Sequence, residues 1–115
     1  MKILLVDDDA FFRGLLSKAL SKTGYETVLA SDGREAIEKI KDQTFDLVIT
    51  DLFMPNMAGF EFIQEIRKTN PEIKIIAISS DAIASLSSVL ERAQGLGATA
   101  LLQRPFSPEQ LIGQI

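Results

Sequence analysis

Five short apolar runs alternate with stretches that carry the apolar spacing of helices, and this alternation constrains the fold of the 115-residue chain most strongly. The runs predict strands over residues 2–6, 25–30, 46–50, 73–78 and 99–102. In the fourth run, residues 75–78 are all apolar, which is typical of a parallel strand covered by helices on both faces. The sheet is therefore expected to lie between two layers of helices.

The stretches between the runs predict helices. In the first helix, the apolar stripe consists of Phe11, Phe12, Leu15, Leu16, Ala19 and Leu20. The other four helices are expected around residues 36–40, 60–66, 83–93 and 107–115. Gly24 suits the end of the first helix, and Ser31 or Asp32 can cap the start of the second.

Five repeats of a strand followed by a helix predict an α/β fold, because right-handed crossovers place helices on both faces of a parallel sheet. The expected architecture is a flavodoxin-like (βα)5 three-layer sandwich with a five-stranded parallel sheet in the order 2-1-3-4-5. A closed eight-stranded barrel would need about twice this length of chain. We expect one domain over residues 1–115.

Composition excludes several kinds of site. The chain has no Cys and no His, which excludes disulfides, thiolate zinc sites and the usual general base. The net charge of −4 argues against nucleic-acid binding, which needs clustered Lys and Arg. No apolar run approaches the roughly 20 residues of a membrane span, and no signal peptide precedes the first strand. A soluble cytoplasmic protein is therefore expected.

Acidic residues follow two of the apolar runs. Asp7, Asp8 and Asp9 follow the first run, and Asp51 follows the third. These two strands are neighbours in the expected order, so their carboxylates should meet at one edge of the sheet. Two unit charges ~4 Å apart repel by roughly 4 kcal/mol at an effective dielectric of about 20. A divalent cation would offset this repulsion, and a cation beside a carboxylate nucleophile is typical of phosphoryl transfer.

Two further groups are expected at the same edge. The fourth strand ends in Ser79 and Ser80, and Arg104 follows the fifth strand. A hydroxyl and a cation would therefore approach the acidic residues from the other side. The site would then combine carboxylates, a hydroxyl and a fixed positive charge.

Four segments make the chain resemble a response regulator receiver domain of two-component signalling. They are Leu5–Asp8, Asp51–Gly59, Ser79–Ser80 and Arg104–Phe106. The segment Asp51–Gly59, with Met-Pro followed by Gly, is the most specific of them. The order and spacing of all four strengthen the resemblance, which covers essentially the whole chain.

The resemblance implies that Asp51 is a phosphoacceptor, loaded from a phosphohistidine of a sensor histidine kinase or a phosphotransfer protein. It implies Mg²⁺ as the cofactor, with Asp7, Asp8, Asp51 and the backbone carbonyl of Phe53 as ligands. Mg²⁺ prefers hard oxygen ligands in an octahedron, which suits this donor set. The resulting acyl phosphate would hydrolyse on its own, so the chain would be a signalling switch rather than an enzyme with turnover.

The resemblance also implies that Ser79 and Arg104 assist the transfer. Each would contact a phosphoryl oxygen of a loose transition state whose charge is spread over three oxygens. Phosphorylation would then change binding to a downstream protein or a fused output domain. A homodimer is a further expected assembly, and neither nucleic acid nor membrane is an expected partner.

The chain departs from the family pattern at several positions. Arg104 stands where the family usually has Lys, and its planar guanidinium reaches differently from an ammonium. Leu101 stands where the family usually has an aromatic residue. The stretch from Ser80 to Ala98 is a few residues longer than usual, and the last helix, Ser107 to Ile115, is short.

Two alternatives remain open from the sequence. The first is a receiver-like docking module that has lost phosphorylation, which the residues Arg104 and Leu101 motivate. The second is a phosphatase of the haloacid dehalogenase type, because residues 5–9 also resemble the opening motif of that class. In that class Asp7 would be the nucleophile and Asp9 the acid and base, which leaves Asp51 unexplained.

Overall fold

The computed structural model describes residues 1–52, 59–79, 95, 97–103 and 106–115 of the chain. Its strands are β1 (Lys2–Val6), β2 (Glu26–Ala30), β3 (Leu47–Asp51), β4 (Lys74–Ser79) and β5 (Ala100–Gln103). Its helices are α1 (Ala10–Lys22), α2 (Gly33–Asp42), α3 (Gly59–Thr69) and α5 (Pro108–Gln114). The helix expected around residues 83–93 lies outside the described residues.

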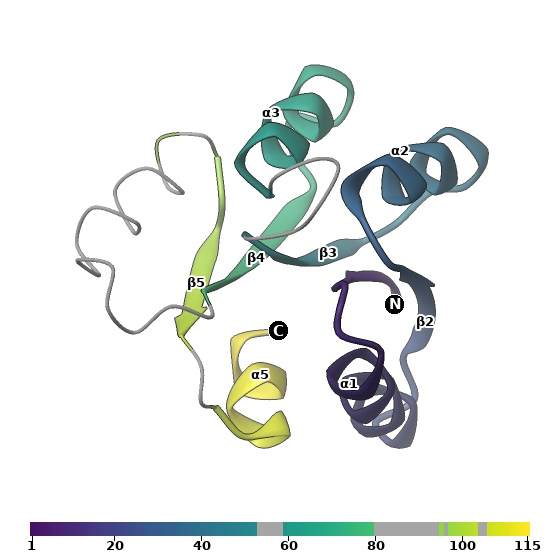
Figure 1. Ribbon diagram of the computed structural model, residues 1–115, viewed down its shortest axis with the longest axis vertical. Coiled ribbons are helices and arrows are strands. Elements are labelled where there is room, and N and C mark those ends of the chain that lie inside the picture. The colour runs from purple at the N-terminus through teal and green to yellow at the C-terminus, as the bar shows by residue number, and fades with distance from the viewer. Residues whose placement is uncertain (53–58, 80–94, 96, 104–105) are drawn as a thin grey trace.

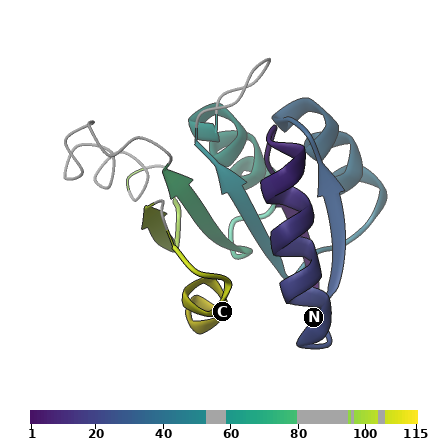
Figure 2. The ribbon, with the colours of Figure 1, turned by 60° about the horizontal axis from the view of Figure 1, so that its bottom comes forward.

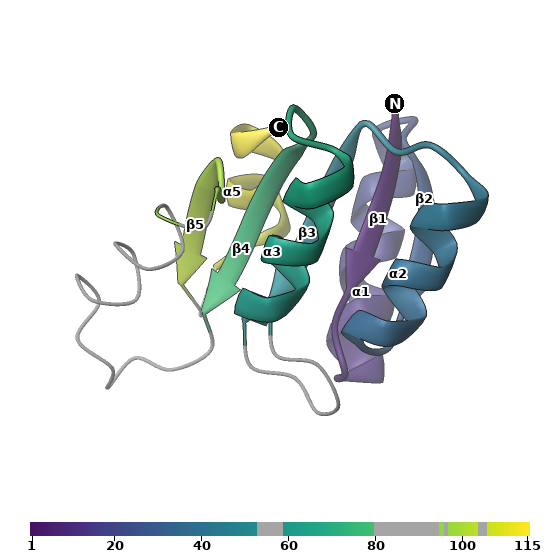
Figure 3. The same cartoon turned by 90° about the horizontal axis from the view of Figure 1, so that it is seen from above.

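The strands form one sheet in the order β2-β1-β3-β4-β5, and every neighbouring pair is parallel. The predicted α/β class with a parallel sheet is confirmed. Figure 3 shows the strands running in one direction, so that all their carboxyl ends lie at the same edge of the sheet. We call this the carboxyl edge and the opposite one the amino edge.

Two layers of helices cover the sheet, with α2 and α3 on one face and α1 and α5 on the other (Figures 1 and 2). Alternate residues of β1, β2, β3 and β4 enter two separate cores. In β1, for example, Leu4 and Val6 pack toward α2 and α3, whereas Ile3 and Leu5 pack toward α1 and α5. All four side chains are fully buried. The two cores therefore hold the ends of β1 and β3 in fixed positions.

Two residues of the predicted apolar stripe of α1 lie on the exposed side of the helix. Phe11 is 80% exposed and Leu15 is 45% exposed, whereas Leu16 and Leu20 are buried. Residues four apart lie on one row of a helix, and the row through Phe11 and Leu15 lies about 100° around the helix from the row through Leu16. Only the second row faces the sheet, so the predicted stripe was too wide.

Capping residues lie at several ends of the described helices. Asp32, one of the two predicted caps, accepts a hydrogen bond from the Glu35 backbone N–H at the start of α2. Gly24 follows the end of α1 with φ +88°, a conformation that favours glycine. Ser107 and Gln110 form a capping box at the start of α5. The local sequence therefore specifies where these helices begin and end.

At the amino edge, hydrogen bonds from Arg67 connect α3 with the turn that follows it and with the segment before β5. Its guanidinium donates hydrogen bonds to the carbonyls of Asn70, Pro71 and Ile73, which follow α3, and to the carbonyl of Gly97, which precedes β5. The shortest, to Ile73 and Gly97, are 2.6 Å long. Burial lowers the pKa of Arg67. The cation is therefore held by main-chain dipoles rather than by a carboxylate among the described residues.

Gly97 fits tightly beneath this side chain. Its φ is +108°, and a Cβ atom at this position would lie 2.7 Å from Arg67 Nε. A larger residue would therefore both strain the backbone and displace the guanidinium.

None of the helices in the described part of the chain has the length and apolar character of a membrane span.

Candidate functional site

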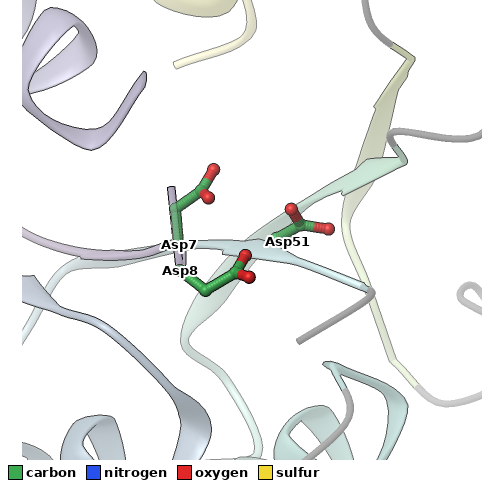
Figure 4. A group of neighbouring side chains, drawn as sticks. All are labelled: Asp7, Asp8 and Asp51. Atoms are coloured by element: carbon green, nitrogen blue, oxygen red, sulfur yellow. The ribbon is translucent and has the colours of Figure 1, made fainter. Parts of the chain in front are cut away.

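Three carboxylates meet at the carboxyl edge of the sheet. Asp7 and Asp8 directly follow β1, and Asp51 is the last residue of β3. Because Val6 pairs with Thr50, the two strand ends lie side by side. One carboxylate oxygen from each of the three acids lies within 4.8 Å of the others, and Figure 4 shows the side chains grouped at the strand ends. The structure thus brings together the three acids that the sequence predicted to converge.

The three acids differ in their exposure to solvent. Asp7 is 0% exposed and Asp51 is 2% exposed, whereas Asp8 is exposed. Burial of ionised carboxylates is costly unless opposite charges or hydrogen-bond donors offset it. The group therefore has two buried acids and one that faces solvent, from which a ligand can approach.

Hydrogen bonds fix the turn between β1 and α1. The backbone N–H of Asp7 donates to the Ala30 carbonyl over 3.1 Å, which continues the pairing of β1 with β2. The Asp7 carboxylate accepts from the Asp9 backbone N–H over 2.9 Å. The Asp7 carbonyl accepts from Arg13 Nη1 over 2.6 Å. Both the main chain and the side chain of Asp7 are therefore held in place.

Asp9 serves the helix rather than the acidic group. Its carboxylate accepts hydrogen bonds from the backbone N–H groups of Phe11 and Phe12, which makes it the N-cap of α1. A carboxylate that caps a helix is poorly placed to act as an acid and base. This geometry argues against the dehalogenase-type phosphatase, which needs Asp9 in that role.

The end of β3 is also restrained. Thr50, a buried polar residue in an otherwise apolar run, donates its hydroxyl hydrogen bond to the Asp51 carbonyl over 3.0 Å. The Leu52 backbone N–H donates to the Ile78 carbonyl of β4 over 2.9 Å. The main chain on both sides of the Asp51 side chain is thereby fixed.

Arg13 and Thr50 were missed by the sequence reasoning. The signal for Thr50 was its polarity within the apolar run, and that for Arg13 was its place one helical turn after the capping Asp9. Neither signal specifies its acceptor, because both acceptors are main-chain carbonyls. Only the folded geometry shows that they contact residues of the acidic group.

The donor set fits a hard divalent cation. Carboxylate oxygens are the ligands that Mg²⁺ prefers, and Mg²⁺ sites commonly use one or two carboxylates together with waters. The oxygens of Asp7, Asp8 and Asp51 are close enough to share one ion. The exposed position of Asp8 leaves room for water or a phosphoryl group. A cation would also offset the repulsion between the acids.

The remaining predicted site residues fall at or beyond the limits of the described chain. Ser79 is the last residue of β4, one position after Ile78, which pairs with Asp51. Its backbone therefore lies at the same edge as the acidic group. Phe53, Ser80 and Arg104 lie outside the described residues.

Comparison with known proteins identifies one family. The family model of the response regulator receiver domain matches residues 3–115. The chain is 39% identical over 112 residues to the chemotaxis protein CheY of Thermotoga maritima, covering 96% of this chain and 91% of that protein. It is 37% identical to the response regulator MprA of Mycolicibacterium vanbaalenii, covering 100% of this chain and 48% of MprA. The chain thus spans about half the length of MprA.

Solved structures agree with this result. The chemotaxis response regulator CheY4 of Vibrio cholerae superposes with a TM-score of 0.91 and 35% identity, covering 98% of this chain and 93% of that chain. A CheY-like receiver domain protein of Methanospirillum hungatei gives a TM-score of 0.90 and 30% identity, covering 98% and 88% of the two chains. The family model, the related sequences and the related structures all identify the same family. The chain belongs to the response regulator receiver domain family.

Proposed function

We propose that Asp51 is the phosphoacceptor of this receiver domain. The observation that carries the proposal is the position of Asp51, which is 2% exposed at the end of a central strand. Its carboxylate lies within reach of the same ion as Asp7 and the solvent-exposed Asp8. A buried carboxylate grouped with a solvent-exposed one is suited to in-line transfer, which depends on positioning and charge stabilisation.

The proposed reaction forms one bond and breaks one. A carboxylate oxygen of Asp51 attacks the phosphorus of a phosphohistidine on a sensor histidine kinase or phosphotransfer protein. The P–N bond breaks, the P–O bond of an acyl phosphate forms, and the imidazole leaves. Mg²⁺, when bound, supplies positive charge that reduces the repulsion between two anions. Water later hydrolyses the acyl phosphate, which returns Asp51 and releases phosphate.

The finer roles rest on the family resemblance. Asp7 and Asp8 would hold Mg²⁺ together with Asp51 and the carbonyl of Phe53. Ser79 and Arg104 would each contact a phosphoryl oxygen. Phosphorylation would then alter binding to a downstream protein or fused output domain in the cytoplasm, with self-dephosphorylation as the only other chemistry.

Intact mass after treatment with acetyl phosphate and Mg²⁺ tests the proposal. The wild-type chain should gain one phosphoryl group, and Asp51→Asn should gain none. Asp9→Asn is the matched control, because it removes the same charge from the same edge while Asn still caps a helix. This control should gain the group as the wild type does.

Each contrary outcome has a specific meaning. A wild-type chain that gains no phosphoryl group at saturating Mg²⁺ would support the docking module that has lost phosphorylation. An Asp51→Asn variant that still gains the group would place the acceptor elsewhere. Loss in Asp9→Asn alone would favour the dehalogenase-type chemistry.

A further inference from the structure

We propose that Arg13 is a positioning residue for the acidic group, because it holds the peptide group that joins Asp7 to Asp8. This inference rests on the proposed function, in which both acids bind Mg²⁺. Arg13 Nη1 donates to the Asp7 carbonyl over 2.6 Å, a shorter distance than the 2.9 Å from the Asp9 backbone N–H to the Asp7 carboxylate. One guanidinium thereby fixes the link between two carboxylates of the site.

The hydrogen bond continues the sheet where the neighbouring strand stops. The Asp7 backbone N–H donates to Ala30, the last residue of β2. In a strand, the N–H and C=O of one residue point to the same side, so the Asp7 carbonyl also points toward β2. There the chain turns away to the N-cap of α2 at Asp32. Arg13 supplies the donor that a longer β2 would have supplied.

The start of α1 places Arg13 for this task. Asp9 is the N-cap, and the Arg13 backbone N–H donates to the Asp9 carbonyl over 2.9 Å, so Arg13 lies one turn into the helix. Helical side chains lean toward the helix N-terminus, which directs Arg13 back to the end of β1. The side chain is half-buried, so water competes only partly for its acceptor.

The orientation of this peptide decides where Asp8 points. The Asp7 backbone N–H donates to the Ala30 carbonyl of β2, and the Asp7 carbonyl accepts from Arg13. The Asp7 carboxylate accepts from the Asp9 backbone N–H. Asp8 is exposed and follows the peptide that Arg13 holds. Without Arg13, this peptide could rotate and carry the Asp8 carboxylate away from Asp51. The site would then bind a cation more weakly.

A simple charge effect predicts the opposite result. If Arg13 acted only as a nearby positive charge, its removal would strengthen Mg²⁺ binding, because the acidic group would become more negative. If Arg13 positions the acids, its removal weakens binding. Partners that orient metal ligands commonly contribute roughly tenfold or more to metal affinity. The sign of the change therefore separates the two roles.

The test is a Mg²⁺ titration followed by backbone amide shifts in the wild type and in Arg13→Gln, Arg13→Lys and Lys18→Gln. We expect Arg13→Gln to raise the Mg²⁺ Kd by roughly tenfold. Arg13→Lys should recover part of the loss, because lysine keeps a donor but not the planar guanidinium. Lys18→Gln is the matched control, since Lys18 is exposed on the same helix, and it should leave the Kd within about twofold of the wild type.

An unchanged or lower Kd in Arg13→Gln would overturn the inference. The spectrum without Mg²⁺ verifies that each variant is folded, and Arg13→Lys serves as the test if Arg13→Gln is not. Failure of the proposed function has a different signature. In that case the wild type would show no saturable Mg²⁺ shift at residues 7–9 and 50–52, or Asp8→Asn would bind Mg²⁺ as well as the wild type.

Discussion

The two edges of the same sheet differ in how their charged side chains are arranged. At the carboxyl edge, Asp7, Asp8 and Asp51 bring carboxylates within 4.8 Å of one another. At the amino edge, the Asp46 carboxylate accepts a hydrogen bond from the Lys2 backbone N–H over 2.8 Å. The cation Arg67 likewise donates to main-chain carbonyls there. Three carboxylates are therefore grouped at one edge, whereas at the other edge Asp46 and Arg67 each form hydrogen bonds with the main chain.

This difference indicates that the charged side chains of the two edges affect the stability of the fold in opposite directions. Matched charges at the amino edge stabilise the fold, because the hydrogen bonds connect segments far apart in the chain. Crowded carboxylates at the carboxyl edge destabilise it unless a cation is present. Substitutions at the amino edge should therefore lower stability, whereas removal of an acid at the carboxyl edge should raise it. Three predictions test this contrast.

The largest effect is expected at Arg67. Arg67→Ala removes the donor for four main-chain carbonyls, among them Ile73 and Gly97. A hydrogen bond to a charged group contributes a net stabilisation of about 1.5–3 kcal/mol. In the variant, water replaces Arg67 as the donor to some of these carbonyls, so the four losses do not add in full. We expect the free energy of unfolding to fall by about 2–4 kcal/mol, measured by urea denaturation.

Lys68→Ala is the matched control for this prediction. It removes the same charge from the next position of α3, where the side chain is exposed and forms an ion pair with Glu65. Exposed pairs contribute little, so stability should change by about 0.5 kcal/mol or less. Equal losses in the two variants would show that Arg67 does not stabilise the amino edge through its hydrogen bonds.

A smaller effect of opposite sign is expected at Asp51. Without metal and at low salt, Asp51→Ala should raise the free energy of unfolding near pH 7 by about 1 kcal/mol, because it relieves repulsion from Asp7 and Asp8. The gain should shrink at acidic pH, because neutral carboxyl groups do not repel one another. Saturating Mg²⁺ should reverse the order, since the wild type binds the ion more tightly.

Thermal unfolding over pH and Mg²⁺ concentration measures this effect. Stability of Asp51→Ala that is unchanged or lower than the wild type at pH 7 would contradict the view that the carboxyl edge is crowded. The same experiment on Asp46→Ala sharpens the contrast, because this carboxylate has a backbone donor at the amino edge.

The smallest effect concerns Glu35, an exposed acid of α2 that accepts hydrogen bonds from Ser31. Hydrogen bonds from the side chain and backbone of Ser31 lower the pKa of Glu35. A lowered pKa means stability that is present above the ordinary Glu pKa and is lost as pH falls through the folded value. Glu35→Gln should therefore lower stability at pH 7 by less than about 0.5 kcal/mol, since the side chain is largely exposed.

The difference between Glu35→Gln and the wild type should shrink as pH falls below the ordinary Glu pKa and vanish below the lowered pKa of folded Glu35, where both side chains are neutral. Urea denaturation at several pH values measures it. A difference that persists at low pH would assign the effect to packing rather than to charge. The hydrogen bonds that lower the pKa of Glu35 would then not account for its effect on stability.

The features predictable from sequence were those that depend on periodicity. The strand bounds agree with the prediction within one residue at each end, because consecutive apolar residues bounded by polar turns specify a buried parallel strand. The meeting of Asp7, Asp8 and Asp51 followed from strand order alone. Periodicity could not decide which of two adjacent rows of α1 faces the sheet, and so the exposure of Phe11 was missed.

Contacts to the main chain could not be predicted. Arg67 reaches Gly97 across 30 positions, and its acceptor is a carbonyl that every residue possesses. The same holds for Arg13 and the Asp7 carbonyl. Such contacts depend on the path of the backbone after folding, and residue types carry no signal for it. The roles expected for Ser79 and Arg104 remain predictions.

The place of β1 in the sheet has a consequence during synthesis of the protein. Among the strands of this sheet, β1 is synthesised first, and its two partners are β2 and β3, with Ile3 paired to Thr27 and Leu47. At roughly 5–20 residues per second, the second partner arrives about 2–9 seconds after the strand itself. Until then this largely apolar strand has at least one unpaired edge, and it is most exposed to aggregation and to chaperones.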